Sequence, residues 1–192
     1  MTTTTRTDEG GILALWRAEA RLRRDRRAAL QELESCFAAG SAPEGLDGPL
    51  DGRLLTTTLG FGLDVLVEAA TRAWLPWVGK SFEAASERGR NRFVPGARPF
   101  VRLIWPGYRD LRPGSAEGFT AFGFETSVGP SVTDPATRVL RIDYDDPASP
   151  WPIRLVLDEL VLVEDGQHLG QALVRRGGAF RRAAWFALEP PA

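Results

Sequence analysis

The stretch from Arg138 to Glu189 constrains the fold most, because three segments of strand-like composition follow one another there. The segments are 138–145, 153–163 and 169–189, and the last one folds back at Arg176-Gly177-Gly178. The short breaks between them contain Asp-Asp-Pro, Glu-Asp-Gly and Gly-Gly, which are typical of turns between antiparallel strands. The sequence therefore predicts consecutive β-hairpins in this half of the chain.

Both faces of the segment 153–163 are largely apolar. One face would hold Ile153, Leu155, Leu157, Glu159, Val161 and Val163, and the other Arg154, Val156, Asp158, Leu160 and Leu162. An antiparallel sheet with one solvated face would show alternation of polar and apolar residues instead. We therefore predict an antiparallel β-barrel, or a strongly curled sheet, of about eight strands whose outer face is covered by helices.

Helical patterns precede the barrel and interrupt it. Residues 1–10 are polar and are expected to be disordered, and residues 11–40 form an Arg-rich amphipathic helix that ends at Gly40. A barrel domain is expected over 46–189, with its first strand at 52–59 and a second helix at 63–75. The predicted fold class is α+β, mainly β.

The middle of the chain predicts further strands at 91–94, 100–105 and 119–128, and a turn or short strand at 77–82. Residues 83–92 are polar and are expected to form a loop. Gly123 interrupts the pattern of 119–128, which predicts a bend or a β-bulge of the kind that helps a barrel to close.

Composition excludes several classes of protein. The formal net charge is −1, so we expect neither a nucleic-acid partner nor attraction to anionic membranes. With one cysteine, Cys36, and one histidine, His168, the chain has no thiolate cluster and no multi-histidine metal site, so we expect no metal. The sequence has no Walker A loop, no GxSxG motif and no apolar run of membrane-spanning length, and a cytoplasmic location is expected.

Two carboxylates interrupt the apolar segment 153–163. Asp158 and Glu159 point to opposite faces, so one of them should face the barrel interior. An inward carboxylate could act as a catalytic acid or base together with Tyr108 or Tyr144, or it could anchor a ligand with Arg141 or Arg154 as its partner. The alternative is a structural salt bridge at the rim of the barrel. Lys80 is the only lysine, and we interpret the arginine-rich composition as a coding bias.

The remaining candidates for a ligand site are mostly aromatic. A cavity could be lined by Trp105, Tyr108, Phe122, Phe124, Tyr144, Trp151 and Trp185, or these residues could form a plain core. His168 lies beside a turn, where it could bind haem iron, act as a base or simply lie at the surface. Asp143 and Asp145 could form a general acid/base pair or, with Asp146, bind a cation, or they could form a charged outer face.

Seven short pieces of the chain resemble a family of small bacterial proteins of lipocalin-like (calycin-like) type. They begin at Leu46, Trp77, Trp105, Arg141, Leu157, Leu169 and Ala184, and they span residues 46–189. The chain is more distantly similar to GXWXG-motif proteins and to nitrobindin-like haem barrels. The region that matches their motif reads Gly52-Arg-Leu-Leu-Thr56, without the signature tryptophan, so the resemblance implies a barrel without a cofactor.

The hypothesis that follows is non-covalent binding of a small hydrophobic or aromatic molecule inside the barrel. The alternatives are a cofactor-independent cyclase or isomerase that acts on a polyketide- or terpenoid-like substrate, and a protein that binds a partner, including a second copy of itself as a homodimer, through the Arg-rich helix. A cavity with purely apolar walls would favour binding, and a buried carboxylate near a tyrosine would favour catalysis.

Overall fold

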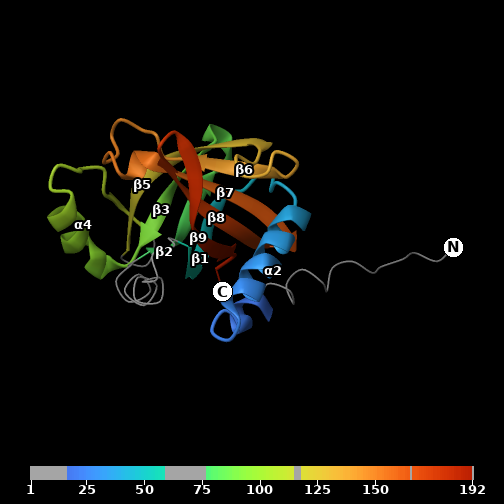
Figure 1. Cartoon of the computed structure of the whole chain (residues 1–192). Helices are drawn as coiled ribbons and strands as arrows, with labels where there is room; N and C mark the ends of the chain where they lie inside the picture. The colour runs from blue at the N-terminus through green and yellow to red at the C-terminus, as the bar shows by residue number, and fades with distance from the viewer. Residues whose placement is uncertain (1–16, 59–76, 115–117, 165, 192) are drawn as a thin grey trace.

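Eight antiparallel strands close into a barrel in the computed structural model, which describes residues 17–58, 77–114, 118–164 and 166–191 (Figure 1). The pairing of β3 with β5 closes the ring, and a two-residue strand, β4, adds to the edge of β5. The strands are β1 (Gly48–Thr57), β2 (Trp77–Glu83), β3 (Arg88–Phe93), β4 (Arg112–Pro113), β5 (Phe119–Pro130), β6 (Arg138–Asp143), β7 (Val156–Glu164), β8 (Gln167–Arg176) and β9 (Ala179–Glu189). The predicted mainly-β barrel fold is therefore confirmed.

The hairpins predicted from the C-terminal stretch are present as β6 to β9. β7 and β8 pair from Val156↔Val174 to Glu164↔Gln167, and β8 and β9 turn at Gly177 and Gly178, where both glycines have positive φ. One boundary differs, because residues Ile153–Leu155 form a short 3₁₀ turn and the strand begins only at Val156. Pro150 and Pro152 shortly before it favour this turn, since proline lacks the N–H that a strand would use.

Two predictions for the middle of the chain are wrong. Residues predicted as the strand 100–105 form the helix α4 (Arg98–Ile104), and residues of the predicted loop 83–92 form most of β3. Pro99 lies in the first turn of α4, where its missing N–H has no intrahelical partner to lose. β3 lies between β2 and β5, so tertiary pairing overrides its polar sequence.

Helices lie on opposite sides of the barrel, with α2 (Arg26–Ala39) on one side and α4 on the other (Figure 1). The predicted N-terminal helix is interrupted, because residues 17–21 are helical, 22–24 form a turn and Asp25 then caps α2 through the N–H of Ala28. The predicted helix 63–75 lies outside the described residues. Within the described residues, no helix has the length and apolar character needed to cross a membrane.

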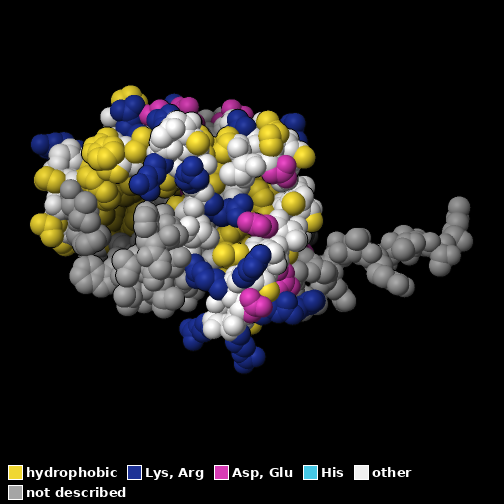
Figure 2. Space-filling view, viewed as in Figure 1, with side chains coloured by type: hydrophobic (Ala, Val, Ile, Leu, Met, Phe, Trp, Pro, Cys, Tyr) yellow, Lys and Arg dark blue, Asp and Glu magenta, His cyan; other side chains and the backbone are white. Residues whose placement is uncertain are grey.

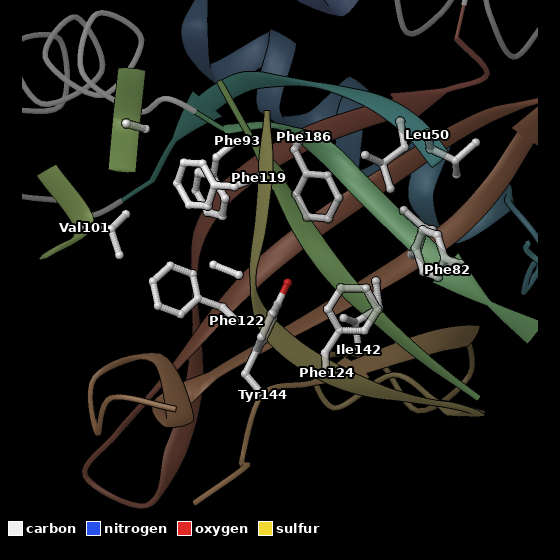
Figure 3. Close-up of a cluster of buried hydrophobic side chains, with 14 of the residues drawn as sticks. Leu50, Phe82, Phe93, Val101, Phe119, Phe122, Phe124, Ile142, Tyr144 and Phe186 are labelled. Carbon is white, nitrogen blue, oxygen red and sulfur yellow. The ribbon is translucent and has the colours of Figure 1, made fainter. Parts of the chain in front are cut away.

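The barrel has an apolar layer on each side of its wall. Outside, α2 packs Leu33 and Phe37 against Val161, Leu169 and Trp185, which explains the two-faced apolar strands. Inside, a larger cluster gathers aromatic side chains from several strands, and these side chains point toward one another across the interior (Figure 3). The space that they leave open is the candidate site.

A β-bulge at Phe122 shapes this interior. Arg90 pairs with Gly123 and Asn91 with Ala121, so Phe122 is the extra residue, and its φ of 50° is uncommon for a residue with a side chain. The N–H of Phe122 donates to the hydroxyl of Tyr108 at 2.6 Å, which holds the bulge. The bend predicted at Gly123 is present one residue earlier.

Candidate functional site

The barrel interior contains a cavity of about 430 Å³ between the strands and α4. In Figure 2, hydrophobic side chains gather on the side of the molecule where α4 lies, while charged side chains of both signs mix over α2. The walls of the cavity are mostly apolar and aromatic. They include Leu54, Trp77, Phe93, Val101, Trp105, Phe122, Ile153, Val156, Ala172, Ala184 and Phe186.

A polar cluster interrupts these apolar walls at Lys80, Asn91, Tyr144 and Asp158. The ammonium of Lys80 donates to Asp158 Oδ2 at 2.8 Å, to Asn91 Oδ1 at 3.0 Å and to the hydroxyl of Tyr144. Only 2% of the surface of Lys80 is exposed, and 5% of that of Asp158. We call these four side chains the polar cluster.

Strand periodicity brings the polar cluster together. Lys80 on β2 and Asn91 on β3 are directly paired, while Tyr144 follows β6 and Asp158 lies on β7 opposite Ile142. Each side chain points to the interior because alternate residues of a strand share a face. The barrel thus brings residues that are far apart in the sequence within hydrogen-bonding distance.

Asn91 connects the polar cluster to the barrel wall. Its Oδ1 also accepts from Trp77 Nε1 at 3.0 Å, and its Nδ2 donates to the carbonyl of Phe122 at 3.2 Å. The second bond joins the cluster to the β-bulge. Buried networks in which the groups are satisfied hold their members in one geometry.

Aromatic rings surround the ammonium of Lys80. Its Nζ lies 5.1 to 5.6 Å from the ring centroids of Trp77, Phe124, Tyr144 and Phe186. A cation at this distance is attracted to the negative face of a ring. The charge of Lys80 is therefore held by one carboxylate and by aromatic rings, away from water.

Burial also changes the proton affinities of the polar cluster. Desolvation lowers the pKa of Lys80, and Asp158 acts in the opposite direction. Desolvation raises the pKa of Tyr144 well above its usual range, and the nearby charge of Asp158 raises it further. Tyr144 thus keeps its proton at neutral pH and can donate a hydrogen bond.

Among the described residues, one acceptor of the polar cluster has no donor. Asp158 Oδ2 receives Lys80 and lies 3.0 Å from the Tyr144 hydroxyl, whereas Oδ1 has no hydrogen-bond partner among the described residues. Asp158 lines the cavity as a residue, and its Oδ1 is a buried acceptor with no donor in the described part of the chain.

Glu159, the other carboxylate predicted to be functional, lies outside the barrel. It is fully buried and accepts from Ser131 Oγ at 2.6 Å, from Val132 N at 2.7 Å and from Gln171 Nε2 at 2.8 Å. These bonds attach the turn after β5 to the sheet. Glu159 therefore does not reach the cavity, and its position suits a structural role.

The predicted aromatic residues divide into three groups. Trp105, Phe122 and Tyr144 line the cavity, and Phe124 and Tyr108 are buried in the same interior cluster beside it. Trp185 faces outward and packs edge-on against Phe37 of α2, and Trp151 is 73% exposed. The proposed cavity role is therefore wrong for these two tryptophans.

Arg141 and Arg154, the predicted basic partners of the inward carboxylate, do not contact Asp158. Arg141 lies on the outer face of β6 and donates to the carbonyl of Pro130, and Arg154 pairs with Asp145 at 2.7 Å. The partner of Asp158 is Lys80 instead. The only lysine in the chain was the signal for this partner, and the interpretation of composition as coding bias missed it.

His168 is buried inside the barrel, so its expected surface position is wrong. It is 3% exposed on β8, pairs in register with Leu188 and is not among the cavity-lining residues. Desolvation lowers the pKa of its imidazole. Asp143, Asp145 and Asp146 are exposed, as a charged outer face requires.

Comparisons with known proteins add little to this geometry. No protein-family model matches the chain, and no curated protein matches it. The solved structure of a protein from Thermomonospora curvata is similar over 92% of this chain and 99% of that one, with 15% sequence identity and a TM-score of 0.46. A likeness at this level identifies no ligand, so the function rests on the residues of the cavity.

Proposed function

We propose that the barrel binds a small, mainly apolar molecule in the cavity. The observation that carries this proposal is a cavity of about 430 Å³ whose aromatic and aliphatic walls are interrupted by the polar cluster. Ligand sites of about 300 to 1,000 Å³ commonly combine apolar walls with a few placed polar groups. The barrel fold is compatible with such binding, since closed barrels of this size can hold one small ligand.

A cavity-filling substitution tests the proposal. Ala184 lines the cavity, and Ala184→Phe would place a ring in the space for the ligand. Ala179 lies exposed on the same strand, so Ala179→Phe adds the same ring outside the cavity and serves as the control. We expect an environment-sensitive apolar dye to bind the wild type and Ala179→Phe, and not Ala184→Phe.

The natural ligand can be sought by native mass spectrometry of the full chain purified from its own host. A small molecule lost on denaturation would support the proposal, and its mass would identify the ligand class. If the dye binds all three proteins equally well, the cavity is not the binding site and the proposal fails.

A second function, cofactor-independent isomerisation or cyclisation of a polyketide- or terpenoid-like substrate, is favoured by one observation. Asp158 and Tyr144 lie 3.0 Å apart at the cavity wall, both buried, which is the arrangement expected of a general acid and base. Asp158 Oδ1 would take a proton from a carbon next to a carbonyl and return it to another carbon. Tyr144 or Lys80 would donate to the enolate oxygen in between.

Deuterium uptake distinguishes the two functions. In the catalytic case, the wild type in D₂O would speed deuterium exchange at the α-carbon of 1-tetralone, and Asp158→Asn would not. Binding of 1-tetralone with exchange at the rate of buffer alone would leave the binding function and exclude the isomerase for this ketone.

A further inference from the structure

The unsatisfied oxygen of Asp158 indicates what kind of group the ligand carries. Asp158 is 5% exposed, and its Oδ2 already serves Lys80 and Tyr144. Its Oδ1 has no donor among the described residues and belongs to a residue of the cavity wall. A buried acceptor without a donor is destabilising, so a donor brought by a ligand would be bound favourably.

The charges around Asp158 Oδ1 determine which ligand groups can bind to it. An ionised carboxylate can only accept hydrogen bonds, so the group facing it must carry an O–H or N–H. A carboxylate on the ligand would be repelled by Asp158. A ligand cation would be repelled by the ammonium of Lys80, which lies 2.8 Å from the other oxygen of the same carboxylate.

We propose that the cavity binds a neutral apolar molecule with a hydroxyl or N–H group, and that this group donates to Asp158 Oδ1 while the aromatic walls hold the rest. This assignment rests on the proposed binding function and narrows it to a ligand class. Lys80 and Asn91 position the carboxylate without contacting the ligand donor. Phe122, Tyr144 and Phe186 line the same cavity. Figure 3 shows how their side chains lie in the barrel interior.

Three matched naphthalenes test the assignment on the full chain. They are 2-naphthol, 2-methoxynaphthalene and 2-naphthoic acid, which share one ring system and differ in the polar group. We expect 2-naphthol to bind about tenfold tighter than the ether or more, because a buried hydrogen bond to a charged acceptor is made only by the naphthol. The acid should bind weakest of the three, as measured by calorimetry at pH 7.

Asp158→Asn gives a sharper outcome. Lys80 must still meet an acceptor, so the amide oxygen of the new side chain would face Lys80 and its NH₂ group would face the cavity. The preference for the naphthol should then be lost, because the naphthol oxygen and the ether oxygen can both accept from this NH₂ group. Glu159→Gln makes the same chemical change one residue away on the outer face, and it should keep the wild-type preference.

The outcomes separate this inference from the proposed function. Equal affinity of the wild type for the naphthol and the ether would overturn the donor assignment and leave apolar binding intact. Failure of all three compounds and of the apolar dye to bind would overturn both. Because the ligand series uses the wild-type protein, the inference stays testable even if Asp158→Asn does not fold.

Discussion

Replacing Lys80 with methionine tests whether the polar cluster is an ion pair held in an apolar environment. Methionine keeps most of the volume of the lysine stem, so the main change is the loss of the ammonium. Asp158 would then keep a buried carboxylate with Tyr144 as its remaining donor in the cluster. Removing one partner of a buried pair destabilises a protein by about 3–5 kcal/mol, because the other charge stays uncompensated.

For a chain of 192 residues, that loss corresponds to a melting temperature lower by about 6–20 °C. The free energy of unfolding should be measured by urea denaturation. Its slope against urea concentration should be the same in the variant and in the wild type, so that the difference reports stability alone. Arg88→Met is the matched control, since Arg88 pairs with Glu125 at 2.7 Å while both side chains are at least 66% exposed. Exposed pairs contribute about 0–1 kcal/mol, and equal losses in the two variants would refute the reasoning.

Three further predictions concern the acid limb of stability, the outer carboxylate and the barrel interior. Burial lowers the pKa of His168, so the native state binds fewer protons than the unfolded chain below pH about 6.5 and stability falls as the pH drops through that range. Between pH 7 and pH 5, the free energy of unfolding measured with urea should fall less in His168→Gln than in the wild type. An equal fall in the two proteins would contradict this. Glu159→Gln should lose about 1–3 kcal/mol of unfolding free energy, while the exposed Glu125→Gln should change it by less than about 0.5 kcal/mol; similar values would exclude the buried network. Gly170→Ala would place a Cβ 2.2 Å from the ring of Phe186 and should lower the free energy of unfolding by about 1–3 kcal/mol in the same assay. The Cβ of Gly96→Ala would meet no described atom within 4 Å beyond its chain neighbours, so this control should be neutral.

The barrel itself could be predicted from the sequence because its strands are apolar on both faces. The parity of β7 and β9 indicates two apolar layers, and the structure has them, with α2 outside and the aromatic cluster inside. What the pattern could not decide is which face points inward. That choice depends on closure and on the bulges between strands, which are tertiary features.

Local propensity failed where tertiary pairing or a proline decided the structure. The residues Phe100 to Ile104 have the composition of a strand and form a helix, because Pro99 starts one and the neighbouring strands are already paired. The polar cluster was predicted in part, since an inward carboxylate near Tyr144 was expected on β7. Its partners were not: the single lysine was a signal for Lys80, but the pairing that brings Lys80 and Asn91 to Asp158 is a tertiary feature.

The stability of a buried Lys80–Asp158 pair and its role in binding can be separated by removing both charges. An apolar pair of similar volume in place of a buried ion pair is often as stable as the original or more stable, because no desolvated charge remains. We therefore expect Lys80→Met/Asp158→Leu to recover most of the unfolding free energy lost by Lys80→Met alone. The same double variant should bind 2-naphthol and 2-methoxynaphthalene with equal affinity, since the acceptor is gone. If the double variant regains stability but no longer prefers 2-naphthol over the ether, the ion pair serves ligand binding, because the apolar side chains pack equally well in its place. A double variant as unstable as Lys80→Met would instead show that the pair is needed to hold the barrel.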